Sequence, residues 1–579
     1  MSEDQNGSAE TAIALEFMIG VTGHRDTLPS DEIELKKHVT EVLVEVKGKF
    51  SSLPCRVFTG LAEGADTLVT EVALDLGVPV CAVLPMPRDE YVKDFEGASR
   101  DRFLALLEDD RLLVHELPIV AQNASADLSS DEARVAQYEA LMDFLVRRSN
   151  IMLALWDGKV LDSKGGTSDV ISSFLAGHAQ HRTPTCVDSS GPMFEDYGDL
   201  AVWIKTPRKS SSGIGVEPAV FLVSEASGMV YSEMKNIPDQ FLARWQGFET
   251  YSNARFSDEA ADVTCWPLTG DDVIGSSPQA HAINQEFIRA DQLAMANQKF
   301  SDNLFKSFGL IAGAMGLLFL VYAKLAALSE FLWIYVALYV VGFIMFRKGA
   351  NRHWFSRHLS YRAFAETMRV QYFMLVAGVG REFSPRHVVS LTSVDRFKGF
   401  EWLQDAVRCL EPLTYEGHKV DEARIEAVQR NWIEDQSNYF SRKLHTLHAQ
   451  HERLEKIKAL LMFGSVLGAL ALIVFKYQLY KAEMAGFNAK TWLVFFMGLL
   501  PLWLAIWELY QGKMATRELI WQYANQRRYF VAAKHQMEAA KDIDTKRRVL
   551  TDLADRALAE IYLWSAHRFH REHEPPAAG

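Results

Sequence analysis

Short apolar runs alternate with helical patterns in the first part of the chain. In residues 57–77, for example, a strand pattern and a turn with two glycines precede Leu68, Val72 and Leu76, which recur at helical spacing. Parallel strands need such crossover helices, so this order predicts an α/β domain with a parallel sheet. The predicted strands cover residues 15–21, 55–58, 78–84, 111–117, 151–156, 183–187, 201–205 and 219–223.

From residue 282 onward the pattern changes to long helices that contain two pairs of apolar runs. The pairs are residues 304–323 with 331–346 and residues 459–475 with 492–507, and Lys306 is the one charge within them. Sixteen helical residues cover roughly 24 Å, against a hydrocarbon core of about 30 Å, and flanking aromatic and basic side chains extend the reach. We therefore predict four transmembrane helices; the alternative is a set of core helices in a soluble bundle.

The membrane half has the pattern of a duplication. Each apolar pair is preceded by a long polar helix and followed by a helix that contains a Tyr-Phe pair, Tyr372-Phe373 and Tyr529-Phe530, 157 residues apart. We therefore divide the chain into five parts. These are an α/β domain (12–225), a linker or irregular extension (226–280), a first two-helix membrane unit (281–385), a connector (386–434) and a second two-helix unit (435–570).

Charge and cysteine content narrow the possible partners. The net charge of −13 and the pI near 5.8 argue against broad nucleic-acid binding, which needs a basic face. The five cysteines have no CxxC spacing, so we expect neither a metal site nor disulfides. The polar N-terminus has no signal-peptide pattern. Basic residues flanking the apolar runs predict a multi-pass protein of the inner (plasma) membrane with both termini in the cytoplasm.

The candidate chemistry lies at the carboxyl ends of the predicted strands. A strand, a glycine turn and a helix aim free backbone N–H groups at the space above the strand, which favours phosphate. Here Thr59, Gly60 and Gly64 would bind phosphate, and Glu63 or Asp66 would accept from ribose hydroxyls. The alternative is that the glycines serve only the turn and that Asp66 caps the helix.

Three further segments follow other strands and would meet in the same crevice. Arg25 offers a bidentate contact to phosphate; the alternative is that it forms a surface salt bridge. Arg88 offers a second phosphate contact, and Tyr91 beside it either stacks on the ligand or packs in the core. The segment at 164–169 is either an anion-binding nest or a plain turn into a helix. The candidate ligand-binding residues outside the first loop are Thr22, Gly23, His24, Arg25, Arg88, Gly165, Gly166, Thr167 and Asp169.

The motifs favour binding over catalysis. The sequence has no Ser/His/Asp arrangement, HExxH or Walker A lysine, so we assign no catalytic residue and no cofactor. The four apolar cores carry no acidic or basic residue beyond Lys306, which disfavours an ion-coupled transporter. Glycines 309, 313, 316, 464 and 468 suit close helix contacts and oligomerisation, or are tolerated facing lipid.

The run Thr59-Gly-Leu-Ala-Glu-Gly-Ala-Asp66, together with Gly20-Val-Thr-Gly-His-Arg25 and Gly165-Gly-Thr167, resembles the Rossmann-like SLOG superfamily, including its DNA-processing protein A family. The resemblance covers roughly residues 12–206. It implies an α/β Rossmann-like parallel sheet domain, followed here by an all-α membrane domain with four transmembrane helices and long cytosolic helices. Some members remove the base from nucleoside monophosphates; others sense nucleotide messengers.

Departures from these motifs favour a sensor. The segment 164–169 lacks the leading proline and ends in Asp169 instead of the enzymes' glutamate, and Glu63 replaces the DNA-binding family's arginine. The joined membrane units are similar to SLATT-type effectors. The resemblance implies an oligomeric effector that binds an ADP-ribose-like or cyclic nucleotide-like ligand and permeabilises the bilayer in antiphage defence. The alternatives are a membrane-anchored nucleotide N-glycosidase (phosphoribohydrolase) of the LOG type and a ligand-independent scaffold.

Overall fold

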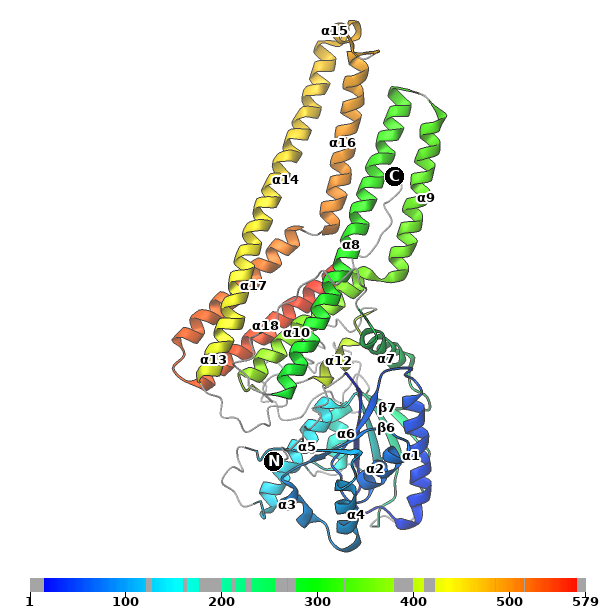
Figure 1. Ribbon diagram of the computed structural model, residues 1–579, viewed down its shortest axis with the longest axis vertical. Coiled ribbons are helices and arrows are strands. Elements are labelled where there is room, and N and C mark those ends of the chain that lie inside the picture. The colour runs from blue at the N-terminus through cyan, green and yellow to red at the C-terminus, as the bar shows by residue number, and fades with distance from the viewer. Residues whose placement is uncertain are drawn as a thin grey trace, which may run out of the picture.

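The computed structural model has an N-terminal α/β domain followed by a helical part that extends far from it (Figure 1). The described residues are 15–120, 128–159, 164–175, 199–209, 215–224, 231–255, 268, 277–326, 328–379, 399–410, 422–484, 486–514 and 516–569. The expected strand at 183–187 lies outside them.

A mixed eight-stranded sheet forms the centre of the α/β domain, with strand order β4-β3-β2-β1-β5-β6-β7-β8. The six strands from β1 to β6 run parallel, whereas β7 and β8 are antiparallel, so the expectation of a parallel sheet is correct for six of eight strands. Their bounds are β1 Phe17–Gly23, β2 Cys55–Thr59, β3 Val80–Leu84, β4 Leu112–Glu116, β5 Ile151–Trp156, β6 Leu200–Lys205, β7 Val220–Ser224 and β8 Tyr231–Met234.

The order of the strands reverses between β1 and β5. From β1 the chain adds β2, β3 and β4 on one side, then returns to place β5 on the other side of β1. Every residue of β5 is buried, as expected for a central strand covered on both faces. In such sheets, ligands bind beyond the carboxyl ends of the strands at this reversal. The loops after β1 and β5 are therefore the expected site.

Helices connect the parallel strands and bring the chain back to the amino edge of the sheet. Their bounds are α1 Glu32–Lys47, α2 Ala65–Asp75, α3 Arg88–Tyr91, α4 Gly97–Leu107, α5 Asp131–Arg148 and α6 Thr167–Leu175. Helix α7, Asp239–Ser252, follows β8, so the region expected as a linker or irregular extension contains a sheet edge and a helix. On α7, Trp245 packs against Phe17 and Phe50, and Glu249 accepts from the amides of Ser51 and Ser52.

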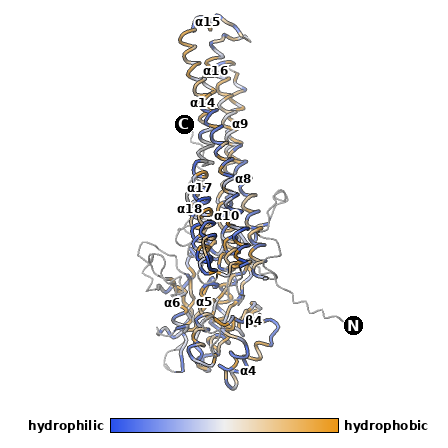
Figure 2. The backbone as a smooth tube through the Cα atoms, turned by 90° about the vertical axis from the view of Figure 1, so that its left-hand side faces the viewer, coloured by the Kyte–Doolittle hydropathy of each residue, from blue (hydrophilic) through white to orange (hydrophobic). Residues whose placement is uncertain are grey.

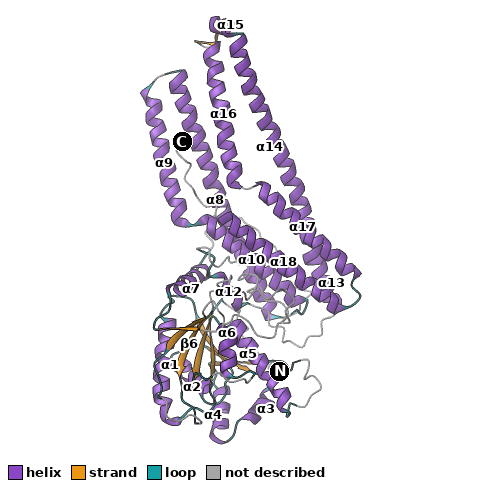
Figure 3. Cartoon of the chain, turned by 180° about the vertical axis from the view of Figure 1, so that it is seen from behind, coloured by secondary structure: helices purple, strands orange, loops and turns teal. Residues whose placement is uncertain are grey.

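The helical part contains two similar units. In the first, the long helix α8 (Pro278–Lys324) is followed by the returning helix α9 (Ser329–Arg352) and then by α10 (Trp354–Val376). In the second, α14 (Asp435–Val474), α16 (Ala489–Met514) and α17 (Thr516–Ala539) repeat this layout, followed by α18 (Ile543–Phe569). Phe373 and Phe530, from the two Tyr-Phe pairs, both pack on Trp432. The repeated Phe positions therefore meet at one side chain. Figure 3 shows the two units side by side, with α8 and α9 next to α14 and α16.

Within the described residues, four helical segments are long and apolar enough to span a membrane. Three of them contain a predicted span in full, and the other ends at Val474, one residue short of the predicted 459–475. At most 6% of the residues in each apolar window are buried within the chain, and large side chains such as Trp333, Phe343, Leu460 and Ile473 are exposed. Such a surface is typical of a face that contacts lipid or another protein. In Figure 2 these segments lie farthest from the α/β domain, with the polar helices α10, α17 and α18 in between.

Glycines allow close helix packing both between the two hairpins and within the second one. A Cβ atom at Gly316 would lie 2.2 Å from Cδ2 of Leu502, and one at Gly468 would lie 3.1 Å from Cγ of Met497. These two positions therefore serve close packing of α8 and α14 on α16. At Gly464 a Cβ would meet nothing within 4 Å, so that glycine fits the alternative of a residue without a helix neighbour.

A short helix from the second half of the chain docks on the amino edge of the sheet. This helix, α12 (Leu403–Cys409), carries Asp405 and Arg408, both fully buried. Arg244 of α7 donates to both oxygens of Asp405 at 2.8 Å, and Arg408 donates to Asp199 and to the carbonyl of Ser149. The α/β domain and the helical part therefore share a buried ionic contact.

Candidate functional site

The two loops at the strand reversal touch each other through His24 and Asp157. Nε2 of His24 lies 3.0 Å from the backbone nitrogen of Asp157 and 3.1 Å from its Oδ1. With its proton on Nδ1 the neutral imidazole accepts from this backbone N–H, and with its proton on Nε2 it donates to the Asp157 carboxylate. The neutral form agrees with the pKa of His24, which burial lowers more than the neighbouring Asp157 raises it. His24 thus joins the ends of β1 and β5 through its contacts with Asp157.

The glycine loop after β2 packs directly on the loop after β1. Gly64 has a φ of +84°, and a Cβ there would lie 2.5 Å from the carbonyl oxygen of Arg25 and 2.6 Å from that of His24. The amide of Ala65 donates to the His24 carbonyl at 3.0 Å. Only glycine allows this approach, which explains its place in the motif.

Most amides of this loop already have partners inside the protein. The amide of Leu61 donates to Oγ1 of Thr59 at 3.1 Å, and that of Ala62 donates to Oδ2 of Asp66 at 3.3 Å. Thr59 and Gly60 are buried beneath the loop, whereas Glu63 is exposed. The expected phosphate cradle is therefore largely satisfied by the chain itself, and the accessible part of the loop is at Glu63 and Gly64.

Asp66 holds the loop from within. Helix α2 begins after Gly64, so the interpretation of Asp66 as the helix cap is wrong; it lies inside the first turn and reaches back to Ala62. It is 7% exposed, and burial raises its pKa to about 6, against the opposing effects of the Ala62 amide and Arg25. Its assignment as a ribose contact stays a prediction, and any such contact would have to reach a buried carboxyl group.

This pKa gives a testable pH dependence. The folded state binds the Asp66 proton more tightly than the unfolded state, so stability should fall as pH rises from about 4 to 6 and then stay level. A shift of about two units corresponds to roughly 3 kcal/mol. Asp66→Asn, which keeps an acceptor for Ala62, should remove this slope and be the more stable protein at pH 7. Thermal unfolding of both proteins in detergent between pH 3.5 and 7.5 measures it; coincident profiles would contradict the role of Asp66.

Arg25 is the accessible cation of the site. Its side chain is exposed, and its guanidinium carbon lies 5.0 Å from the centre of the Tyr138 ring on α5. Tyr138 donates to Asp94, which also accepts from Arg134. Neighbouring protein atoms remove part of the hydration of this exposed side chain, which opposes its charge, but Tyr91, Tyr138 and Asp94 outweigh that effect and raise the pKa of the guanidinium. The salt-bridge alternative is not observed: within the described residues, no carboxylate forms an ion pair with Arg25.

The segment before α6 reaches the same side chain of α5. Gly165 has a φ of +70°, and a Cβ there would lie 3.4 Å from Cβ of Tyr138. Oδ2 of Asp169 accepts from the Gly165 amide at 2.9 Å, so Asp169 orders the turn into the helix. Gly166, directly before α6, and Thr167, its first residue, are half-exposed. Tyr138 therefore brings Arg25 and this segment together.

The remaining predicted residues differ in accessibility. Thr22 is buried in β1, and a Cβ at Gly23 would lie 2.3 Å from Cβ of Ala65. Tyr91 is fully buried and donates to the Gly60 carbonyl at 3.0 Å, so it packs and does not stack on a ligand. Arg88 is exposed on α3, and no contact places it beside Arg25.

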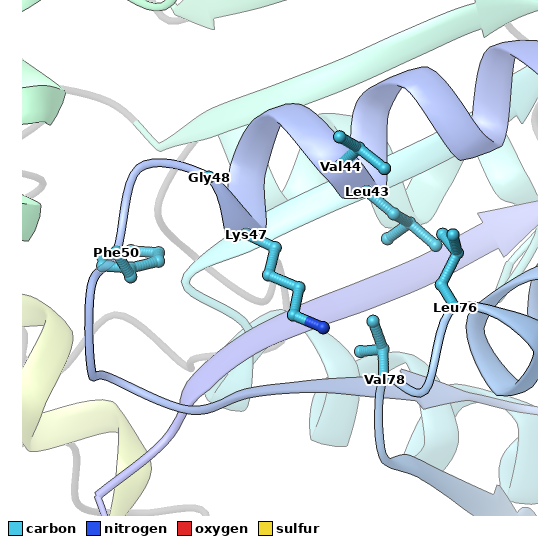
Figure 4. Close-up of a pocket in the computed structure, with 7 residues that line it drawn as sticks. All are labelled: Leu43, Val44, Lys47, Gly48, Phe50, Leu76 and Val78. Carbon is cyan, nitrogen blue, oxygen red and sulfur yellow. The ribbon is translucent and has the colours of Figure 1, made fainter.

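Sequence reasoning did not single out Tyr138 or Asp94. They lie far from the glycine motifs in sequence, and nothing in the sequence pairs residue 138 with residues 25 and 94. A pocket of 340 Å³ lies elsewhere, between the ends of α1 and α2 at the amino edge (Figure 4). It is lined by Leu43, Val44, Lys47, Gly48, Phe50, Leu76 and Val78, and includes none of the predicted residues.

No group of three or more His, Cys, Asp or Glu side chains within the described ranges has the arrangement of a metal site. Comparisons of the chain with models of protein families, with curated proteins and with solved structures found no match in any of the three. Function is therefore inferred from the geometry of this site and its place in the molecule.

Proposed function

We propose that the protein is a membrane-embedded effector that senses a nucleotide-derived ligand through its α/β domain. The observation that carries this proposal is the accessible Arg25 at the strand reversal of a Rossmann-like sheet, in a chain that also has four helices able to span a membrane. An exposed guanidinium beside a helix start suits phosphate, and the adjacent half-exposed glycines let a ligand approach the backbone.

The two strands that flank the site also lead to the helical part. Strand β1 carries His24 and Arg25 beyond its carboxyl end, and before its amino end the carbonyl of Glu16 accepts from the Cys409 thiol at 3.1 Å. Strand β5 leads to Asp157 and is preceded by Asn150, which donates to Asp405. A change in the spacing of β1 and β5 would thus alter the hydrogen bonds that the residues just before these strands make with α12.

From α12 the contact continues toward the membrane. Nε2 of Gln371 on α10 donates to the carbonyl of Val407 at 3.3 Å, and α10 packs along α8 and follows α9 directly. In the proposed mechanism, ligand binding shifts these contacts, favours an oligomer and opens a path across the bilayer. To change the ratio of active to resting protein from 1:99 to 99:1, the ligand would have to bind the active state about 5.5 kcal/mol more tightly than the resting state.

The SLOG-like and SLATT-like assignments and a role in antiphage defence form part of this proposal. A hydrolase of the LOG type is less favoured, because Asp169, which replaces the enzymes' glutamate, is engaged with Gly165 and Ser173. Both termini in the cytoplasm would place the α/β domain where nucleotide messengers are found.

The proposal predicts ligand-dependent ion flux. Liposomes carrying the protein should release a trapped ion when ADP-ribose or a cyclic nucleotide of the correct kind is added to the face bearing the α/β domain. Arg25→Gln should weaken the response about 10- to 100-fold in ligand concentration, because it removes a charge-assisted contact. Flux and binding, by calorimetry, are measured on the same preparations.

The matched control is Arg111→Gln, an exposed arginine paired with Asp109 at the opposite edge of the sheet. It should leave both readouts unchanged. Binding without flux in any lipid would contradict the pore, whereas release of free base from a nucleotide would identify a hydrolase instead.

A further inference from the structure

We infer that the first membrane hairpin carries a binding site for the phosphate of anionic phospholipids. The hairpin of α8 and α9 ends toward the α/β domain in four exposed cations: Lys306, Arg347, Lys348 and Arg352. Within the described residues, none of them forms an ion pair with a carboxylate. The inference rests on the proposed membrane embedding and is independent of the nucleotide site.

Two of these cations, Lys306 and Arg347, lie at one level of the hairpin, and Arg352 lies about 7.5 Å beyond Arg347 along α9. A Cβ at Gly342 would lie 3.7 Å from Cγ2 of Ile311, which sets the register of α8 against α9. Lys306 is five residues before Ile311 and Arg347 five after Gly342, so both lie about 7.5 Å further along antiparallel axes. Lysine and arginine at the end of an apolar span reach the headgroup level.

Acidic residues do not neutralise this cluster. The sequence has no Asp or Glu between Glu330 and Glu366, so the whole of α9 after its first turn is free of negative charge. The acidic residue nearest to Lys306 in sequence is Asp302, which is half-buried. Burial raises the pKa of Asp302, although Arg568 and Lys306 oppose the rise. The cluster therefore keeps a net positive charge.

Beside the second hairpin, two cations, Lys458 and Arg517, are paired with carboxylates. Lys458 forms ion pairs with Glu508 and, at 3.8 Å, with Glu455, and Arg517 lies 3.7 Å from Glu455. Arg453 and Lys456 are also exposed on α14, and within the described residues no carboxylate forms an ion pair with them. The two units therefore differ in one respect: carboxylates neutralise two of the cations beside the second hairpin, whereas all four named cations of the first hairpin are available to the phosphate of a lipid headgroup.

The test compares two variants that each lose two positive charges. Phosphatidylglycerol titrated into the detergent-solubilised full chain should raise the thermal midpoint at lower concentration than phosphatidylcholine does. R347Q/R352Q should raise the half-saturating phosphatidylglycerol concentration about 30-fold, while R347K/R352K retains wild-type behaviour. K458Q/R517Q, which removes the two paired cations beside the second hairpin, should change it less than threefold.

Different negative results would contradict the lipid site and the membrane embedding. Equal loss in R347Q/R352Q and K458Q/R517Q, equal affinity for both lipids, or the same stabilisation by inorganic phosphate would each overturn the lipid site. A chain that stays soluble without detergent would overturn the membrane embedding on which the inference rests, leaving the nucleotide proposal to its own test.

Discussion

Asp405→Ala should destabilise the protein by about 3–5 kcal/mol, because it leaves a buried arginine without its carboxylate. Asp405 has no exposed surface, Arg244 donates to both of its oxygens at 2.8 Å, and the Arg244 side chain is 6% exposed. The same change removes an acceptor of Asn150. A lower midpoint of unfolding in detergent, relative to wild type, measures the effect.

Replacing both Arg244 and Asp405 with apolar residues separates the effect of an unpaired buried charge from the loss of packing between α7 and α12. Arg244→Met with Asp405→Leu should be less damaging than Asp405→Ala alone, since no unpaired charge remains. Lys205→Ala provides the comparison at an exposed pair, 2.6 Å from Glu217, and should cost at most about 1 kcal/mol. An Asp405→Ala effect as small as that of Lys205→Ala would show that the α12 contact does not hold the two parts together.

The α12 contact also explains what the sequence could not provide. Asp405 and Asn150 are 255 residues apart, and α12 belongs to a region that we assigned only as a connector. Ionic pairing between segments so distant leaves no periodic pattern. The central strands were predictable because β1 and β5 are continuous apolar runs between turns. Strand β8, with the sequence Tyr-Ser-Glu-Met, has no such signal and was missed.

The candidate site was predictable in place but not in detail. The motif order correctly brought the loops after β1, β2 and β5 and the start of α6 to one edge of the sheet, as His24, Gly64 and Tyr138 demonstrate through their contacts. The use of each residue depended on packing: Asp66 and Asp169 bind backbone amides of their own turns. Short polar side chains next to glycine turns satisfy the backbone as readily as a ligand, and only the fold decides between them.

Because most loop amides are bonded within the protein, few groups remain to bind an anion at this site. Arg25 is exposed above Tyr138, while the amides of Leu61, Ala62 and Ala65 are taken by Thr59, Asp66 and His24. The glycine loop then acts mainly as a support that fixes the backbone of residues 24 and 25. A defect in that support should therefore affect stability and ligand binding together.

Gly64→Ala should cost at least about 3 kcal/mol of stability and also weaken any ligand that binds Arg25. The added Cβ would meet two carbonyl oxygens, at 2.5 Å and 2.6 Å, which belong to the backbone and cannot move aside as a flexible side chain would. The conformation itself, with φ +84° and ψ −114°, is also unfavourable for alanine. Thermal unfolding and calorimetric titration of the variant measure the two effects.

Gly77→Ala is the control that separates the steric contact of a new Cβ from the strain of a positive φ. Gly77 also has a positive φ, +63°, but a Cβ there would meet nothing within 4 Å. It should cost only about 1–2 kcal/mol, the backbone strain of a left-handed residue, and leave ligand binding unchanged. If Gly64→Ala were no worse than Gly77→Ala, the approach of the two loops would not be what positions Arg25. A larger loss at Gly64, accompanied by weaker ligand binding, would tie the glycine motif to the support of the β1 loop.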